Sequence, residues 1–378
     1  MSPKSERKES ETDVDVTPAE RYVNLLLTEG TKVTCDETNE SFNRQGNYPA
    51  YYDEALFRRG QQFFYYHISG MFFNKLSGLL VVMGVPSILK ILMATNMSSS
   101  DKTAYRRYMA TILHMLQWYD EDFKPGTEAW NSLLQVRRMH NAASKKCAKK
   151  LNRITQAEMA LTQFGFCGFA LVRSKKVGIH SGTEEDWAAF LHFWRVIGWM
   201  LGIEDRFNLW QGSAQKTRDV CNLLINRVYR PSVHQLDANF VKMTRHLLKG
   251  IGSPVVQYEA MISYLMYLLQ DEDEPAEEMR PFRLQITVYE KTKYYFTHFI
   301  LRTMMSFDWF RATLNYVLLV TIWFIKYFPI IAYVQYGFEN GRVVLNLKHP
   351  NDHLKMNEGD VLLLSGMDNV CFSFIFKG

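Results

Sequence analysis

Helix-start signals recur at short intervals along the middle of the chain, and they constrain its fold more than any other feature. Ser98 to Asp101 offers caps for a helix over residues 102–122. Lys124-Pro125-Gly126 ends that helix, and Thr127 can cap the next one, which reaches about Lys150. The spacing therefore predicts two consecutive helices joined by a short turn.

The same pattern continues toward the C-terminus. Thr155 and Glu158 form a capping box for a third helix, and Thr183 to Asp186 caps a fourth, which ends at Leu201-Gly202. Further helical runs follow Gln215, Ser232 and Val255, with breaks at Pro231 and at Gly252-Ser253-Pro254. We therefore predict an all-α fold: a single large helical domain, with a C-terminal hydrophobic helix and a short β-rich tail.

Changes in composition divide the chain into four parts. We expect residues 1–47 to be a mostly disordered N-terminal tail, because the segment begins with a polar, charged stretch that has no apolar core and is not a secretory signal. Residues 48–310 form the predicted helical domain, and 312–334 the probable membrane segment. Residues 335–378 change to a period of two, which predicts short strands at Val343–Leu347, Val361–Leu364 and Val370–Phe376.

The segment Ala312 to Val334 is almost continuously apolar. Its length matches a bilayer core, for which about 20 residues suffice. Lys326 and Pro329 interrupt it, and the alternative is a buried helix pair broken at Pro329. The earlier stretch Leu79 to Leu92 is shorter and is broken in its middle, so it predicts a buried core helix instead.

Charge and cysteine content exclude several classes of protein. The formal net charge is +5, and no basic tract is dense enough to indicate a nucleic-acid partner. The cysteines are odd in number and no two lie at metal-ligand spacing, so they predict neither a disulfide framework nor a zinc site. They are Cys35, Cys147, Cys167, Cys221 and Cys371.

Basic and hydroxyl side chains on the two consecutive helices are the remaining candidates for chemistry, because the common catalytic signatures are absent. Arg107, Thr111 and His114 lie at i, i+4 and i+7, and Arg137 and His140 also share a helix face. A His nitrogen can ligate haem iron, an Arg can hold propionates or stabilise bound oxygen, and a Thr hydroxyl can hydrogen-bond a ligand. By spacing alone, a structural role for each histidine is the commoner case.

Three sequence blocks, in order, resemble a known family. Val136-Arg137-Arg138-Met139-His140-Asn141-Ala142-Ala143 resembles the Arg-x-x-His helix of the MpaB and latex-clearing protein (rubber oxygenase) catalytic domain, the ER-bound oxygenase type. Ile154 to Met159 followed by Gln163 to Phe166 resembles the next family block, and Trp194 to Asp205 the one after. The resemblance implies an all-helical domain around a haem b pocket.

Roles for individual residues follow from that resemblance. His140 would be the proximal haem ligand and the metal-binding residue, with His114 on the preceding helix as its rival. Arg137 would support the haem or the ligating helix. The family's Arg-x-x-x-Thr pair corresponds to Arg107 and Thr111 near the distal pocket, and Arg106 is an adjacent alternative for the arginine.

The resemblance spans roughly Arg58 to Trp210, and reaches as far as Pro254, but this chain departs from the rubber-cleaving members. Nothing acidic lies between Ala55 and Ser100, where those members carry a proposed base, and Ala110 stands where some carry a distal lysine. The resemblance therefore implies haem binding more strongly than it implies the rubber-cleavage mechanism.

Three functions remain open from the sequence. The first is a haem-b oxygenase that uses dioxygen on a lipophilic, isoprenoid or olefinic, substrate at an intracellular membrane such as the endoplasmic reticulum. The second is a non-catalytic haem- or lipid-binding helical membrane protein that has lost the catalytic base. The third is a membrane-anchored scaffold in which His140 is structural.

Overall fold

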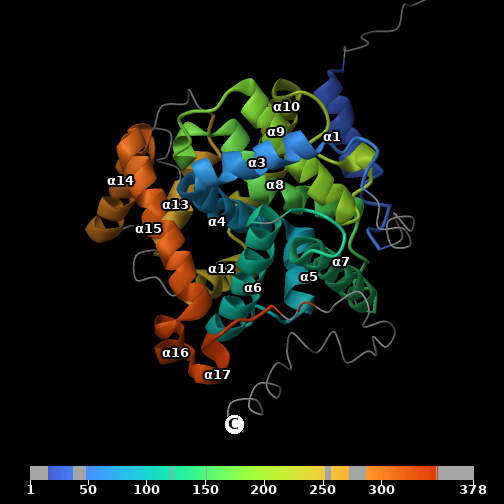
Figure 1. Cartoon of the computed structure of the whole chain (residues 1–378). Helices are drawn as coiled ribbons and strands as arrows, with labels where there is room; N and C mark the ends of the chain where they lie inside the picture. The colour runs from blue at the N-terminus through green and yellow to red at the C-terminus, as the bar shows by residue number, and fades with distance from the viewer. Residues whose placement is uncertain are drawn as a thin grey trace, which may run out of the picture.

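The chain folds into a bundle of helices (Figure 1). The computed structural model describes residues 16–36, 48–120, 122–149, 151–251, 257–271, 287–345 and 347, and within these ranges it contains no β-strand. The predicted all-α fold is therefore confirmed. The α-helices are α1 (Pro18–Thr28), α3 (Glu54–Tyr66), α4 (Ile68–Gly84), α5 (Pro86–Ala94), α6 (Asp101–Asp120), α7 (Glu128–Cys147), α8 (Gln156–Val172), α9 (Glu184–Met200), α10 (Ala214–Leu224), α11 (Arg230–His234), α12 (Ala238–Gly250), α13 (Tyr258–Leu268), α14 (Val288–Arg302), α15 (Asp308–Tyr327), α16 (Ile330–Tyr336) and α17 (Phe338–Gly341).

Helix α4 is the centre of the core. It packs against α8 over much of its length and also contacts α5, α12, α13 and α15. Most of its side chains are buried, and a break at Val85 separates it from α5, which begins at Pro86. The prediction of a buried core helix over Leu79 to Leu92 is therefore confirmed for α4, whereas the second part of that stretch is a separate helix, α5, at a bend of 94°, in which only Ile88 and Leu89 are buried.

The backbones of α4 and α8 approach each other closely where they cross in the core. A Cβ atom at Gly78 would overlap the carbonyl group of Gly165 and would lie 2.7 Å from its Cα atom. In return, a Cβ atom at Gly165 would lie 2.9 Å from the carbonyl oxygen of Gly78. Glycine at both positions therefore allows the two helices to pack backbone to backbone.

The predicted helix starts are confirmed where the sequence supplied caps. The hydroxyl of Thr127 accepts from the backbone N–H of Trp130 at the start of α7. Complete capping boxes begin α8, at Thr155, and α9, at Thr183. Side-chain oxygens thus satisfy N–H groups that the helices leave free.

Part of the N-terminal segment differs from the expected mostly disordered tail. Residues 18–28 form α1, which begins with a capping box between Thr17 and Glu20. Val23 and Leu26 are fully buried against the domain, and α1 packs on α10. The sequence does carry a signal for this helix that the predicted tail left out: Thr17 and Glu20 form the capping box, Pro18 is the first helical residue, and apolar residues follow at helical spacing.

Pro231 does not break its helix, in contrast to the sequence prediction. A π-helical turn, η3 (Ile225–Tyr229), continues α10 into α11, and Pro231 lies in the first turn of α11. The π-helical turn directly before Pro231 already interrupts the regular α-helical hydrogen-bond pattern, so the missing N–H of the proline does not end the helix.

The segment Ala312 to Val334 is two helices. α15 ends before Phe328, and α16 follows at a bend of 50°. Unlike the buried pair that was the alternative expectation, both helices expose most of their apolar side chains. Among the described residues, no single helix has the length and apolar composition to cross a membrane. The two helices of the bent pair α4–α5, taken together, have that length and composition, and so do those of α15–α16.

The predicted β-rich tail needs correction at its start. Residues 335–341 belong to α16 and α17, because this part of the chain packs back against α6. Residues 343–345 have no strand partner among the described residues. The predicted strands Val361–Leu364 and Val370–Phe376 lie outside the described residues.

Candidate functional site

The candidate residues lie on α6 and α7, which pack side by side in opposite directions. Near one end, the amide of Gln117 donates to the carboxylate of Glu128 at 3.0 Å. Near the other end, Arg107 is close enough to His140 for its charge to affect that imidazole. The antiparallel arrangement therefore brings together residues that are far apart in the sequence.

Arg107 projects between the start of α6 and the end of α5. Its guanidinium donates to the hydroxyls of Thr95 at 3.3 Å and Ser98 at 3.4 Å. Among the described residues, no carboxylate pairs with it. Its positive charge is thus available to an anionic group.

His140 lies within electrostatic range of this arginine and has no hydrogen-bond partner in the described part of the chain. Its Nδ1 atom is buried and unpaired, although the side chain as a whole keeps some accessible surface. Burial lowers the pKa of His140 to about 4, and the positive charge of Arg107 contributes to the decrease. The imidazole is therefore neutral at physiological pH, as a metal ligand must be.

His114, the rival ligand, is in a different environment. It is 4% exposed, and its Nδ1 atom lies 2.8 Å from the hydroxyl of Ser132, which also accepts from the indole of Trp118. Burial lowers the pKa of His114 to about 4. Its packing leaves little space for a large planar ligand, whereas His140 retains accessible surface.

We expect the burial of His114 to make stability depend on pH. The unfolded chain binds a proton at His114 near the ordinary pKa of 6.5, and the folded chain does so only near 4, so acid favours unfolding. From about pH 7.5 to about pH 5, wild-type protein should lose about 2 kcal/mol more unfolding free energy than His114→Asn. Urea unfolding at the two pH values measures the difference, and equal losses would show that His114 is not a buried neutral group.

Thr111 and Arg106 have different surroundings on α6. The hydroxyl of Thr111 is exposed and donates to the carbonyl oxygen of Arg107 at 3.1 Å, one turn earlier. Arg106 instead donates to the carbonyl oxygen of Glu339 in α17 at 3.4 Å. The structure therefore brings Arg107, and not Arg106, to the neighbourhood of His140.

Arg137 projects from α7 toward the end of α9. It is 2% exposed and donates to the carbonyl oxygen of Met200 at 2.7 Å. A cation at a helix C-terminus is favourable, although burial lowers the pKa of Arg137 to about 10. This contact ties the helix that carries His140 to the core.

Three hydroxyl residues at the site were not identified from the sequence. Thr95 and Ser98 hold Arg107, and Ser132 holds His114. Ser98 was assigned only to a helix cap, and Ser132 lies in a helix interior. Single hydroxyl residues of this kind give no sequence signal, because only the fold brings them to their partners.

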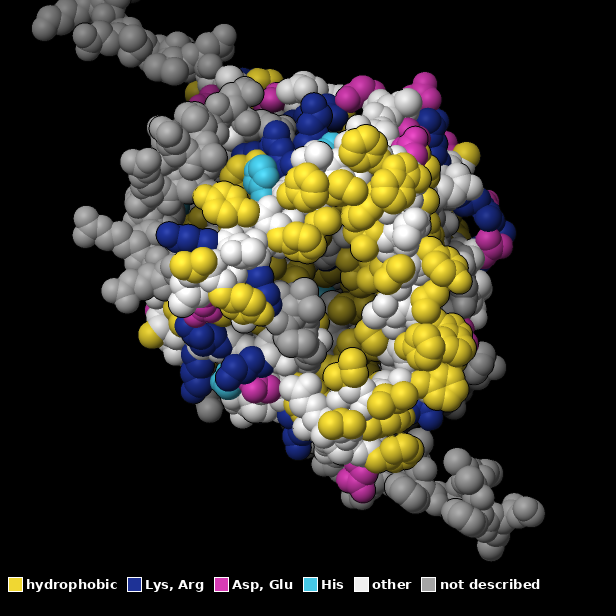
Figure 2. All heavy atoms as spheres, turned by 90° about the vertical axis from the view of Figure 1, so that its left-hand side faces the viewer, with side chains coloured by type: hydrophobic (Ala, Val, Ile, Leu, Met, Phe, Trp, Pro, Cys, Tyr) yellow, Lys and Arg dark blue, Asp and Glu magenta, His cyan; other side chains and the backbone are white. Residues whose placement is uncertain are grey.

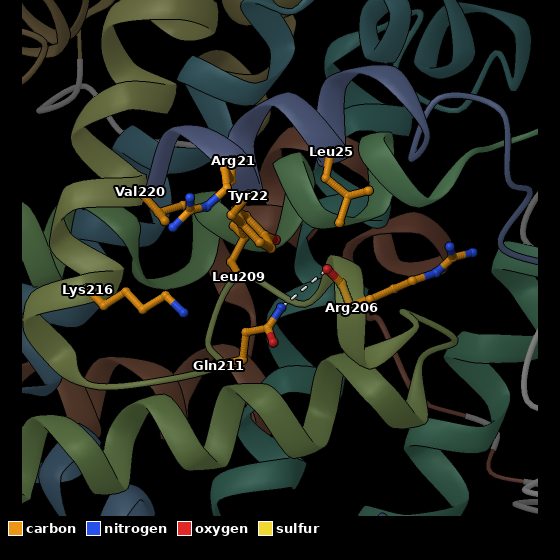
Figure 3. A pocket seen from close by; sticks show the side chains of 8 residues that line it. All are labelled: Arg21, Tyr22, Leu25, Arg206, Leu209, Gln211, Lys216 and Val220. Carbon is orange, nitrogen blue, oxygen red and sulfur yellow. Dashed lines mark hydrogen bonds between the residues drawn. The ribbon is translucent and has the colours of Figure 1, made fainter. Parts of the chain in front are cut away.

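Two cavities elsewhere in the molecule are not lined by the predicted residues. One, of about 290 Å³, lies between α1 and α10 and contains the cationic side chains Arg21, Arg206 and Lys216 around an apolar floor (Figure 3). The other, of about 700 Å³, lies beside α3 and is lined by Tyr66 and His67 among others. Neither joins Arg107 to His140.

The comparison with protein families agrees with the resemblance of the three sequence blocks. The family model described as "ER-bound oxygenase mpaB/B'/Rubber oxygenase, catalytic domain" matches residues 64–321, which is more than half of the chain. A solved structure described as "Structure of Latex Clearing Protein LCP in the closed state" is 17% identical and covers 82% of this chain and 92% of that one, with a TM-score of 0.49. No curated protein matches the chain. The extent of the family match shows that this chain belongs to the family of mpaB-type ER-bound oxygenases and rubber oxygenases and contains their catalytic domain.

Proposed function

We propose that this chain is a haem-b-dependent oxygenase that uses dioxygen to oxidise a lipophilic substrate, isoprenoid or olefinic, at an intracellular membrane such as the endoplasmic reticulum. The observation that carries the proposal is His140, a neutral imidazole with no partner among the described residues, next to the uncompensated charge of Arg107. A histidine of this kind suits an axial iron ligand.

The residues present fit a haem group. His140 would bind the iron, and Arg107 would offer its positive charge to a ligand that binds at the haem, because hydroxyls are its only described side-chain hydrogen-bond partners. Arg137 would fix the position of the ligating helix through Met200. Haem b, when bound, supplies an iron centre that reacts with dioxygen.

The side chains of the chain itself have separate tasks in this proposal. Because His140 is neutral, no proton competes with the iron for the nitrogen that would bind it. Arg107 provides a fixed positive charge in surroundings where burial strengthens electrostatic interactions. The buried apolar side chains Leu113, Leu133 and Val136 on the same two helices exclude water.

Arg107 and Thr111 should affect ligand binding more than haem retention. We expect Arg107→Ala and Thr111→Ala to keep the Soret absorption band, while their affinity for carbon monoxide or cyanide changes by about tenfold, as expected for one lost charge-assisted contact. Titration of the reduced and oxidised proteins measures both properties. Arg106→Ala is the matched control, since Arg106 contacts α17. Loss of haem in Thr111→Ala alone would exclude a distal position for Thr111.

A non-catalytic haem- or lipid-binding function is the second candidate. One specific observation favours it: no acidic residue lies between Ala55 and Ser100, and among the described residues no carboxylate contacts Arg107, Thr111 or His140. The general base proposed for rubber-cleaving relatives therefore has no counterpart at this site.

Oxygen consumption separates the two candidates. Haem-loaded full-length protein would be mixed with an olefinic isoprenoid in detergent micelles, and dioxygen uptake followed with an electrode. The oxygenase should consume dioxygen only when the lipid is present, and Arg107→Ala should reduce the rate. A haem-loaded protein that consumes none with any lipophilic olefin tested would instead be a binding protein.

A further inference from the structure

One side of the molecule exposes large apolar side chains that the core does not use. Helices α14, α15 and α16 run along this side (Figure 1), where apolar side chains gather over a broad, hollowed area (Figure 2). Isolated exposed apolar residues are ordinary, but a contiguous group marks an interaction surface. We call this surface the apolar face and define it by Tyr295, Phe299, Tyr316, Trp323, Ile331 and Val334, which are 40% or more exposed.

Helix α15 lies along the domain and is attached to it at its N-terminal end. The guanidinium of Arg311 donates to the hydroxyl of Tyr66 at 2.6 Å. Asn315 accepts from the backbone N–H of Ser69 at 3.1 Å. The inner side of α15 then packs against the core, so its outer side faces away from the protein; the inner residues are Leu314, Leu318 and Ile322.

The C-terminal end of the apolar face is attached to α6. The ring of Tyr336 stacks on that of Tyr105 with 5.0 Å between centroids, and the hydroxyl of Tyr105 donates to the carbonyl oxygen of Gly341 at 2.6 Å. Ala332 packs against Tyr105, Met109 and Leu113 on α6. Because contacts at both ends hold α15 and α16 against the domain, the apolar face is a fixed part of the surface of the domain.

The composition of this surface is that of a membrane-contacting helix. From Trp309 to Phe338 the only charged residues are Arg311, which is buried against Tyr66, and Lys326, which is exposed. Trp and Tyr side chains are prominent among the exposed ones, and they favour the boundary between headgroups and acyl chains. A single long lysine can reach the headgroups from such a position.

We propose that the apolar face docks the domain onto one leaflet of a lipid bilayer, with α15 and α16 lying along the leaflet and not across the bilayer. The inference deepens the proposed function and rests on it for the lipophilic substrate, which the protein would take from the same leaflet. Helix α6 carries Arg107 and also packs against α16, so the leaflet contact adjoins the candidate site.

Vesicle binding tests the partner. Full-length protein would be floated with vesicles of phosphatidylcholine, alone and with phosphatidylserine added. The combined variant Tyr316→Ser, Trp323→Ser, Ile331→Ser should lower the bound fraction by about tenfold or more, because buried apolar area sets the affinity of interfacial helices. The matched control replaces three exposed apolar residues elsewhere by serine, namely Val16, Leu56 and Met93, and should bind like wild type.

Depth measurement tests the orientation. Thr313, Val317 and Thr321 are exposed on successive turns of α15, and each would be replaced by cysteine in a Cys371→Ser background and labelled with a fluorophore. Lipid-borne quenchers near the headgroups should quench all three labels equally. If α15 crossed the bilayer, Thr321 would lie about 12 Å deeper than Thr313, and a steady change in depth along the three positions would overturn the proposal.

Other outcomes are equally decisive. A wild-type protein that forms a dimer without lipid, which the triple serine variant converts to a monomer, would show that a second copy covers the apolar face. Wild-type protein that has an intact Soret band but does not bind vesicles would overturn only this inference. Vesicle binding by a protein that takes up no haem would leave the inference standing and overturn the proposed function.

Discussion

His140→Ala is expected to lose haem, or to shift the spectrum to that of a different axial ligand, while the protein stays folded. The imidazole is neutral because burial and Arg107 lower its pKa to about 4, and no described residue competes for it. Removing it should abolish the coordinate bond, and haem content per protein should fall by about tenfold or more. Absorbance in the Soret region, normalised to protein, measures the loss, and helical circular dichroism confirms folding.

His114→Ala and His140→Gly are the controls for that assignment. His114→Ala should leave the spectrum close to that of wild type, because His114 packs tightly against Ser132. His140→Gly should recover the wild-type spectrum when free imidazole is added, since the replacement leaves space for it. If folded His140→Ala keeps an unaltered spectrum and His114→Ala does not, the ligand is His114.

Gly78→Ala is expected to have the largest effect on folding. The added methyl group would enter the backbone of α8 at Gly165, which cannot rotate away. We expect the free energy of unfolding to fall by about 3 kcal/mol or more, or the protein to be recovered as aggregate. Thermal or urea unfolding followed by circular dichroism measures the change.

Gly84→Ala provides the comparison on the same helix. Its added methyl group would lie 2.8 Å from Cγ2 of Val233, a side-chain atom, whereas the nearest backbone atom, Cα of the same residue, would lie at an ordinary contact distance of 3.5 Å. The greater helix propensity of alanine should offset that strain, so a change of less than about 1 kcal/mol is expected. Equal stability of the two variants would show that α4 and α8 can separate at Gly78 without cost.

The sequence predicted the elements that carry their own local signals. Thr127, Thr155 and Thr183 begin helices because a side-chain oxygen near the first turn is sufficient to cap it. Helix α1 begins with the same kind of signal, the capping box of Thr17 and Glu20, which the prediction of a disordered tail did not take into account. The burial of Val23 and Leu26 could not be predicted, because it depends on α10, far away in the chain. The break at Pro329 was weighed, but the exposure of both helices around it could not be derived from hydropathy.

The sequence also predicted only part of the candidate site: the residues on α6 and α7, but not their hydrogen-bond partners. Helical spacing and the resemblance identified Arg107 and His140, and the structure brings them together across α6 and α7. The hydroxyl partners Thr95 and Ser98 come from the preceding connection, and their role depends on how that connection folds over α6. Arg137 faces the end of α9 through Met200, a contact that only the tertiary structure defines.

The most direct test of haem binding is the visible spectrum of the full-length protein, produced in cells supplied with a haem precursor and recorded oxidised, reduced and with carbon monoxide. We predict a Soret band that shifts on reduction and again with carbon monoxide, with about one haem per chain, as one axial histidine implies. A folded, helical protein that shows no Soret band, and takes up none when haem is added, would contradict the proposal and leave His140 as a structural residue of a helical scaffold.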